Sequence, residues 1–166
     1  MIEDILDKLA ELCINKKIQF VTAESCTGGL VAKLITDRAG SSQWFERGFV
    51  TYSNLAKEEM LDVDAALLNE WGAVSEQVAA AMAEGALKNS QAQYSLAITG
   101  IAGPDGGTVE KTVGTVCFGW AWLNPESGVI NSITTSEVFA GDREAVRNQS
   151  AFFSLQKLHQ LMVEYN

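Results

Sequence analysis

The sequence predicts an α/β fold, a three-layer α/β/α sandwich on a mixed β-sheet that forms a single domain over residues 1–166. Three observations support this prediction. Segments with helical spacing of apolar residues alternate with short β-branched runs. Two late strand patterns are separated by a turn that contains Pro and Gly, as in a hairpin. A length of 166 residues is enough to bury one substantial core.

The first half of the chain alternates between the two patterns. A helix is expected over residues 1–17, where apolar residues recur at helical spacing, and the run IQFVTAE (18–24) is the first strand. Residues 28–40 follow as a helix with one apolar face and Gly40 as its stop. A strand over 44–53 and a short helix over 55–63 complete this half.

The second half repeats the alternation and then adds the hairpin. Ser75 is a suitable N-cap for an alanine-rich helix over 75–91. The strand pattern of 94–103 runs into a glycine-rich loop, and strands over 112–123 and 129–141 are joined by Asn-Pro-Glu-Ser-Gly. Asp142 then caps a long last helix over 143–165.

Composition and charge exclude several classes of protein. The chain has 12 basic and 21 acidic residues, a net charge of −9, which disfavours a nucleic-acid binder. It has no apolar run of membrane-spanning length and an acidic rather than basic start, so no membrane partner or signal peptide is expected and the protein is predicted to be cytoplasmic. Cys13, Cys26 and Cys117 are an odd number without metal-ligand spacing, which indicates reduced thiols.

A single histidine limits the catalytic chemistry. His159 lies near the end of the last helix and is interpreted as a solvated helix residue. A Ser-His-Asp or Cys-His site would have to use this one residue, and a His-rich metal site is excluded. No metal is therefore predicted, and no cofactor is expected either.

Two glycine-containing loops follow strands directly, where open α/β sheets bind ligands. The first, Glu24-Ser-Cys-Thr-Gly-Gly29, passes from a strand into a helix and offers three candidate nucleophiles in a row. Its free backbone N–H groups would suit an anion or a developing oxyanion. The alternative is structural: Ser or Thr at a helix start is a common N-cap.

The second loop, Thr99–Gly107, holds four glycines, a proline and an aspartate within nine residues. It has neither the Gly-Lys-Ser/Thr of a phosphate-binding P-loop nor the dinucleotide fingerprint. It is interpreted as a ligand-binding loop, with an ordinary surface turn as the alternative.

Without a histidine, a serine can take lysine as its base if burial or a nearby positive charge lowers the lysine pKa. Lys33, Lys57 and Lys111 are the nearest candidates, and Lys57 shares its segment with Tyr52, which could relay a proton or hold the lysine. Arg143 and Arg147, spaced i, i+4, share one face of the last helix and would suit a phosphate, or else form a surface ion-pair face.

Five segments together resemble the nicotinamide-nucleotide amidase family, the domain also found at the C-terminus of CinA (competence/damage-inducible) proteins. The segments are TAESCTGG, AGSSQWFERGFVTYSNLAK, GAVSEQVAAAMAEGAL, TGIAGPDGGTVEKTVGTV and GDREAVR, in order over nearly the whole chain. Because the serine motif lies some two dozen residues from Met1, the N-terminal domain of full-length CinA is not expected here, and the sequence resembles the stand-alone form. Two positions depart from the family pattern: Thr112 stands where proline is expected, and Asp62 where glycine is expected.

The resemblance implies metal-free hydrolysis of nicotinamide mononucleotide to nicotinic acid mononucleotide and ammonia, a step in pyridine-nucleotide recycling. It places the catalytic groups at Ser25, Tyr52 and Lys57, with Ser25 as nucleophile, Lys57 as base and Tyr52 holding the lysine. Backbone N–H groups around Cys26–Gly28 would stabilise the oxyanion, and Thr27 would bond a phosphate or cap the helix. The predicted substrate-binding set from the two loops and the last helix is Cys26, Thr27, Gly28, Gly29, Thr99, Gly100, Ile101, Ala102, Gly103, Gly106, Gly107, Arg143 and Arg147.

Two other functions fit the same residues. One is a catalytically silent nucleotide-binding module, and the other is a serine amidohydrolase for a related nucleotide amide. Ammonia release from a panel of amides separates them, because the silent module releases none. The apolar stripes on the terminal helices, with the family analogy, also suggest a homo-oligomer such as a dimer.

Overall fold

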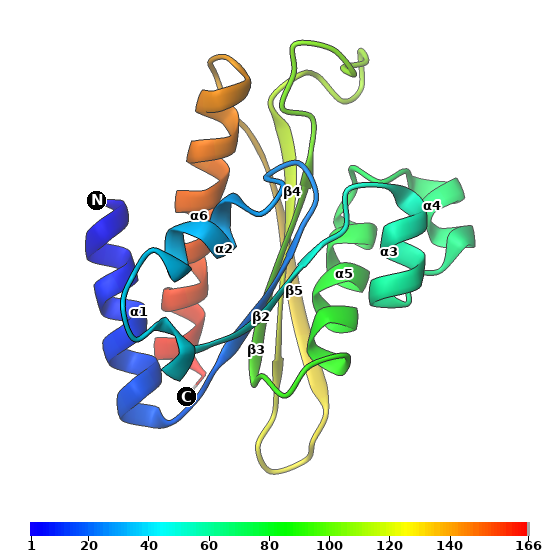
Figure 1. Cartoon of the computed structure of the whole chain (residues 1–166). Coiled ribbons are helices and arrows are strands. Elements are labelled where there is room, and N and C mark those ends of the chain that lie inside the picture. Colours follow the sequence, from blue (N-terminus) through cyan, green and yellow to red (C-terminus); the bar gives the residue numbers. More distant parts are fainter. Residues whose placement is uncertain (166) are drawn as a thin grey trace.

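A five-stranded mixed β-sheet forms the centre of the computed structural model, which describes residues 1–165 (Figure 1). In chain order the strands are β1 (Phe20–Glu24), β2 (Phe45–Val50), β3 (Tyr94–Gly100), β4 (Thr115–Leu123) and β5 (Ile130–Val138). Their order across the sheet is β2-β1-β3-β4-β5. Strand β1 is parallel to β2 and β3, whereas β4 and β5 add antiparallel, so the predicted mixed sheet and late hairpin are confirmed.

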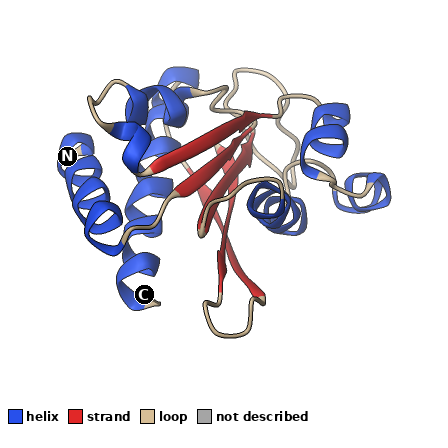
Figure 2. Cartoon of the chain, turned by 60° about the horizontal axis from the view of Figure 1, so that its bottom comes forward, coloured by secondary structure: helices blue, strands red, loops and turns tan. Residues whose placement is uncertain are grey.

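Helices cover both faces of this sheet (Figure 2). On one face lie α1 (Ile2–Lys16), α2 (Leu30–Thr36) and α6 (Arg143–Glu164), and on the other lie α3 (Asn54–Leu61), α4 (Ala65–Trp71) and α5 (Glu76–Lys88). A short 3₁₀ turn, Ser41–Gln43, leads into β2. The predicted three-layer sandwich in one domain is confirmed.

Strand β1 shows how the sequence divides its side chains between two cores. All five of its residues are buried because it pairs on both edges and is covered on both faces. Side chains alternate along a strand, so Phe20 joins the core under α1 and α6 while Val21 and Ala23 join the core under α5. Burial on both faces is typical of a central parallel strand, and here it includes the polar residues Thr22 and Glu24.

Two of the predicted helix starts are confirmed by their capping bonds. Ser75 Oγ accepts a hydrogen bond from Val78 N at 3.2 Å, and Asp142 Oδ1 accepts one from Ala145 N at 2.9 Å. Helix α4 was not predicted. It is seven residues long and capped by Asp64, and so short a pattern is weak evidence beside the flanking turns.

The end of α3 is fixed by the left-handed backbone of Asp62 and by a close contact with Gly85 of α5. Asp62, in place of the expected glycine, adopts the left-handed conformation with φ 57°, which Asp tolerates better than most residues. A Cβ built on Gly85 of α5 would lie 1.9 Å from the Leu61 carbonyl oxygen, so α3 and α5 meet where only glycine fits. This contact sets the position of α3.

The parallel strands bring three connecting segments to one edge of the sheet. The carboxyl ends of β1, β2 and β3 face the same way, so residues 25–29, 51–53 and 101–107 leave from neighbouring points. Over residues 1–165, none of the helices combines the length and apolar character that crossing a bilayer requires.

Candidate active site

Ser25 and Lys57 meet at the carboxyl ends of β1 and β2. Ser25 directly follows β1, and its amide donates to the Ile98 carbonyl at 2.9 Å, which ties it to β3. Lys57 lies in the first turn of α3, which begins where Ser53 Oγ accepts a hydrogen bond from Ala56 N at 3.0 Å. A strand end and a capped helix start therefore hold the two side chains on rigid elements.

Lys57 Nζ lies 3.0 Å from Ser25 Oγ, 2.9 Å from the Thr51 carbonyl oxygen and 3.3 Å from the Tyr52 carbonyl oxygen. The Lys57 side chain is almost fully buried, and Ser25 is 8% exposed. All three contacts of the Lys57 nitrogen are neutral oxygens. Within residues 1–165, no carboxylate forms an ion pair with this lysine.

This environment favours the uncharged amine. Burial lowers the pKa of Lys57 from its usual 10.5, since an ammonium loses hydration that no counter-charge replaces. A neutral amine has two N–H donors and one lone pair. The two carbonyls can take the N–H groups, which leaves the lone pair facing the Ser25 hydroxyl, the arrangement a general base needs.

Cys26, the competing nucleophile, is not activated. Burial raises the pKa of the Cys26 thiol to about 12, although the Arg147 cation opposes this shift. At neutral pH Cys26 is therefore a thiol, which is a weak nucleophile.

His159 lies sixteen residues beyond Arg143 in α6, roughly 24 Å along the helix axis at ~1.5 Å per residue, far from Ser25.

Glu24 is the important residue that sequence analysis missed. Its carboxylate is fully buried, and its two oxygens accept hydrogen bonds from Val31 N at 2.9 Å and Ala32 N at 3.1 Å. From the end of β1, Glu24 thus satisfies the second and third amides of α2, while Leu30 N donates to the Thr27 carbonyl. The available signal was an acidic residue inside an otherwise apolar run.

The structural alternative, that Ser or Thr caps this helix, is therefore wrong. Gly29 is the N-cap of α2 and supplies no side chain. Thr27 is fully buried, and its hydroxyl has no hydrogen-bond partner within the described residues, so it neither caps the helix nor faces solvent where a phosphate could reach it.

The three backbone amides expected to form an oxyanion site differ in their availability. Gly28 N already donates to the Ser25 carbonyl at 3.0 Å. The amides of Cys26 and Thr27 have no acceptor within residues 1–165. These two are the free donors next to Ser25.

The two predicted arginines make different contacts. Arg147 donates from Nε to the Cys26 carbonyl at 3.1 Å and from Nη2 to the Thr27 carbonyl at 2.8 Å. Arg143 donates from Nη1 to the Gly103 carbonyl at 2.8 Å and from Nη2 to the Tyr52 hydroxyl at 3.3 Å. Within residues 1–165, neither guanidinium forms the surface ion pair that was the alternative.

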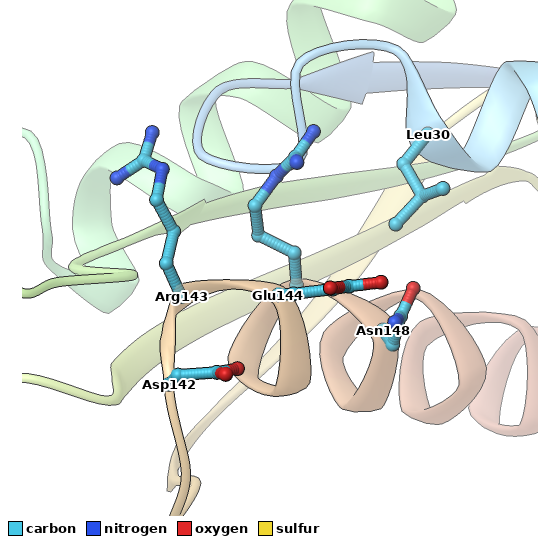
Figure 3. A pocket seen from close by; sticks show the side chains of 6 residues that line it. Leu30, Asp142, Arg143, Glu144 and Asn148 are labelled. Atoms are coloured by element: carbon cyan, nitrogen blue, oxygen red, sulfur yellow. The ribbon is translucent and has the colours of Figure 1, made fainter.

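Two adjoining cavities lie at this edge of the sheet. The smaller, about 190 Å³, is lined by Ser25, Cys26, Tyr52, Asn54, Lys57, Ala73, Val74, Thr99, Gly100, Ala102 and Arg143. The larger, about 510 Å³, is lined by Leu30, Asp142, Arg143, Glu144, Arg147 and Asn148. Figure 3 shows the larger one, with Arg143 projecting from the start of α6 and Leu30 pointing from α2 toward α6. Arg143 borders both.

The glycine-rich loop contributes only part of its predicted set. Thr99, Gly100 and Ala102 line the smaller cavity, and Thr99 Oγ1 donates to the Ala73 carbonyl at 2.8 Å. Neither cavity is lined by Gly28, Gly29, Ile101, Gly103, Gly106 or Gly107. Gly103 contributes through its carbonyl to Arg143.

Asn54, Ala73 and Val74 line the smaller cavity and were not predicted, since no short motif distinguishes them. No three His, Cys, Asp or Glu side chains among residues 1–165 gather closely enough to hold a metal ion.

Comparison with known families and proteins gives consistent matches. The family model for the CinA C-terminal domain matches residues 2–162. The nicotinamide-nucleotide amidohydrolase PncC of Escherichia coli (strain K12) is 57% identical over 143 residues, which covers 86% of this chain and 84% of that protein. A putative competence-damage inducible protein of Symbiobacterium thermophilum is 48% identical over 166 residues, 98% of this chain but 39% of its own length.

Solved structures share the fold. The competence damage-inducible protein A of Klebsiella pneumoniae superposes with a TM-score of 0.92 at 32% identity and covers 99% of both chains. The competence/damage inducible protein CihA of Agrobacterium tumefaciens gives a TM-score of 0.88 at 39% identity, with 96% of this chain and 94% of that chain covered.

Proposed function

The chain belongs to the CinA C-terminal domain family, and we propose that it is an amidohydrolase that converts nicotinamide mononucleotide and water to nicotinic acid mononucleotide and ammonia. The observation that carries this proposal is the 3.0 Å contact between Lys57 Nζ and Ser25 Oγ in a buried, carboxylate-free setting. A serine and a lysine of lowered pKa form a nucleophile and base that need neither histidine nor metal. The 57% identity to a nicotinamide-nucleotide amidohydrolase supports the substrate.

The first chemical step forms an acyl-enzyme. Ser25 Oγ attacks the carboxamide carbon as its proton passes to the Lys57 amine, and the carbonyl oxygen becomes an oxyanion facing the free amides of Cys26 and Thr27. Collapse of this intermediate breaks the C–N bond. Lys57 returns the proton to the leaving nitrogen, so that neutral ammonia departs and Ser25 is left as an ester.

The second step releases the acid. Water attacks the ester carbon and gives its proton to Lys57, now neutral again. The C–O bond to Ser25 then breaks, and the alkoxide takes the proton back from the lysine. The product is released as the carboxylic acid, which gives its proton to solvent to become the nicotinic acid carboxylate, and the enzyme returns to its starting state.

The two cavities suggest where each part of the nucleotide would lie. A volume of about 190 Å³ is small beside the ~300–1,000 Å³ of sites that hold a whole ligand, so only the pyridine ring and its carboxamide would enter beside Ser25. The ribose and phosphate would extend past Arg143 into the larger cavity. Tyr52 would contact the substrate through its phenol, which borders the small cavity beside Arg143.

The proposed partner is this small nucleotide alone. A net charge of −9 repels nucleic acid. Cys13, Cys26 and Cys117 are free and buried, as fits the proposed cytoplasmic location. A homo-oligomer stays a prediction.

The test is ammonia release from nicotinamide mononucleotide by wild type, Ser25→Ala, Cys26→Ala and His159→Gln. We expect turnover to disappear in Ser25→Ala, to survive in Cys26→Ala, which keeps the backbone amide, and to be unaffected in His159→Gln. A wild type that releases no ammonia would refute the proposed substrate, and the panel of nucleotide amides would then distinguish a related amidase from a silent binding module.

A further inference from the structure

Arg147 reaches from α6 to the loop that carries the nucleophile and holds two consecutive carbonyls there. Its Nε and Nη2 donate to the Cys26 and Thr27 oxygens at 3.1 and 2.8 Å. The Thr27 oxygen also accepts from Leu30 N at 3.0 Å, whereas the Cys26 oxygen has no other donor within residues 1–165. The orientation of the Cys26–Thr27 peptide therefore depends on Arg147.

In each peptide unit, the direction of the carbonyl fixes the direction of the N–H group. In a trans peptide the C=O and N–H bonds point in opposite directions across one plane. With the Thr27 carbonyl turned toward Arg147, the next amide, Gly28 N–H, points the other way and donates to the Ser25 carbonyl at 3.0 Å. The side opposite Arg147 is thus the side of the Ser25 main-chain carbonyl, called the Ser25 side below.

The same reasoning applies one peptide earlier. The Cys26 carbonyl faces Arg147, so Thr27 N–H points toward the Ser25 side, where it has no protein acceptor within the described residues. A cation on a carbonyl also polarises the peptide and strengthens its N–H as a donor. The following residues, Gly28 (φ 57°) and Gly29 (φ 98°), give the loop conformational freedom that a clamp must restrict.

We propose that Arg147 is a positioning residue that orients the oxyanion donor, rather than a ligand for the substrate phosphate. It holds the Cys26–Thr27 peptide so that Thr27 N–H is aimed at the oxygen of the attacked carboxamide. Arg143, which lines both cavities, is left as the arginine that meets the nucleotide's anionic end where it passes into the larger cavity. This inference rests on the proposed function, because it requires Ser25 to be the nucleophile.

The experiment separates turnover from binding in Arg147→Met and Arg147→Lys. The kcat is measured with nicotinamide mononucleotide, and the dissociation constant of the same nucleotide is measured by calorimetry in the Ser25→Ala background. We expect Arg147→Met to lower kcat by about 10²-fold or more, the usual loss for one oxyanion donor, while the dissociation constant changes by less than about threefold. Arg47→Met, which removes an exposed arginine of β2 whose partners are Glu46 and the Asn89 carbonyl, is the matched control and should leave both constants unchanged.

The lysine variant keeps the test decisive if the methionine variant does not fold. Lysine retains the charge but cannot bridge two carbonyls with a planar fork, so kcat should still fall by about tenfold or more. Loss of folded protein would lower the melting temperature and the active fraction, but not the kcat of each folded molecule. A variant with wild-type kcat and a weakened dissociation constant would overturn the inference and make Arg147 a phosphate ligand. An inactive wild type would instead refute the proposed function itself.

Discussion

Tyr52 contacts Lys57 through its main-chain carbonyl, 3.3 Å from Nζ, while its phenol hydroxyl accepts a hydrogen bond from Arg143. The phenol ring is mostly exposed at the mouth of the small cavity. The lysine is therefore oriented by two backbone oxygens, from Thr51 and Tyr52, that no side-chain substitution removes. This geometry therefore does not favour a proton relay through the phenol.

The first prediction follows from this arrangement. Tyr52→Phe removes the hydroxyl and leaves the carbonyl that holds Lys57. We expect kcat to fall by less than about tenfold, with the larger effect on KM, because the hydroxyl lies on the proposed path of the nucleotide past Arg143. Steady-state ammonia release measures both constants. A loss of kcat as complete as that expected for Ser25→Ala would show that the phenol takes part in proton transfer.

The second prediction concerns the pH dependence of turnover. Lys57 acts only as the neutral amine, so kcat/KM should rise with pH as this group loses its proton. Because burial lowers the pKa of Lys57, the plateau should be reached below the usual lysine value of 10.5. The profile is measured with nicotinamide mononucleotide from neutral to alkaline pH. A profile that still climbs at the usual lysine pKa would show that the amine is not activated.

The third prediction applies the same pKa shift to stability. Between the lowered pKa of folded Lys57 and the value of 10.5 in the unfolded chain, the unfolded state binds more protons. The free energy of unfolding must therefore gain a rising contribution from this group as pH increases through that window. Lys57→Met lacks the group and should lack this contribution.

Urea unfolding of wild type and Lys57→Met at several alkaline pH values tests the third prediction. The wild type should gain stability relative to the variant with increasing pH. Parallel curves for the two proteins would mean that Lys57 titrates at the same pH in the folded and unfolded states.

The sequence predicted the layers and the mixed sheet for an identifiable physical reason, because helical spacing of apolar residues alternates with short β-branched runs. The absence of any histidine but His159 directs a serine toward a lysine, but the family resemblance was needed to select Ser25 and Lys57. The roles of Tyr52 and Arg147 could not be predicted. They depend on backbone carbonyls, and nothing in a side-chain pattern shows which way a carbonyl points. Glu24 was missed for a related reason, since its partners are the amides of α2.

The fourth prediction tests that role of Glu24. Glu24→Gln replaces one carboxylate oxygen by an NH₂ group that faces a backbone N–H of α2 and cannot accept from it. A buried amide left unpaired should cost about 1–3 kcal/mol of unfolding free energy. Asp37→Asn, in an exposed pair with Lys33 at the end of the same helix, is the control and should change stability by less than about 1 kcal/mol. Equal effects in the two variants would contradict a capping role for Glu24.

The fifth prediction reverses a familiar rule about glycine in helices. Replacing an interior helical glycine by alanine usually stabilises a protein by roughly 0.5–1 kcal/mol. In Gly85→Ala the new methyl would lie 1.9 Å from the Leu61 carbonyl oxygen, so α3 and α5 must separate. We expect a loss of about 1–3 kcal/mol from overpacking, together with reduced kcat because α3 carries Lys57 away from Ser25.

Urea unfolding and ammonia release of the same preparations measure both effects of Gly85→Ala. Gln77→Ala, at an exposed position of α5, is the matched control and should change the free energy of unfolding by less than about 0.5 kcal/mol. A stabilised Gly85→Ala protein would show that α3 can move outward without strain. Destabilisation with unchanged kcat would show that the Ser25–Lys57 contact tolerates that movement, and that Lys57 does not depend on the packing of α3 against α5.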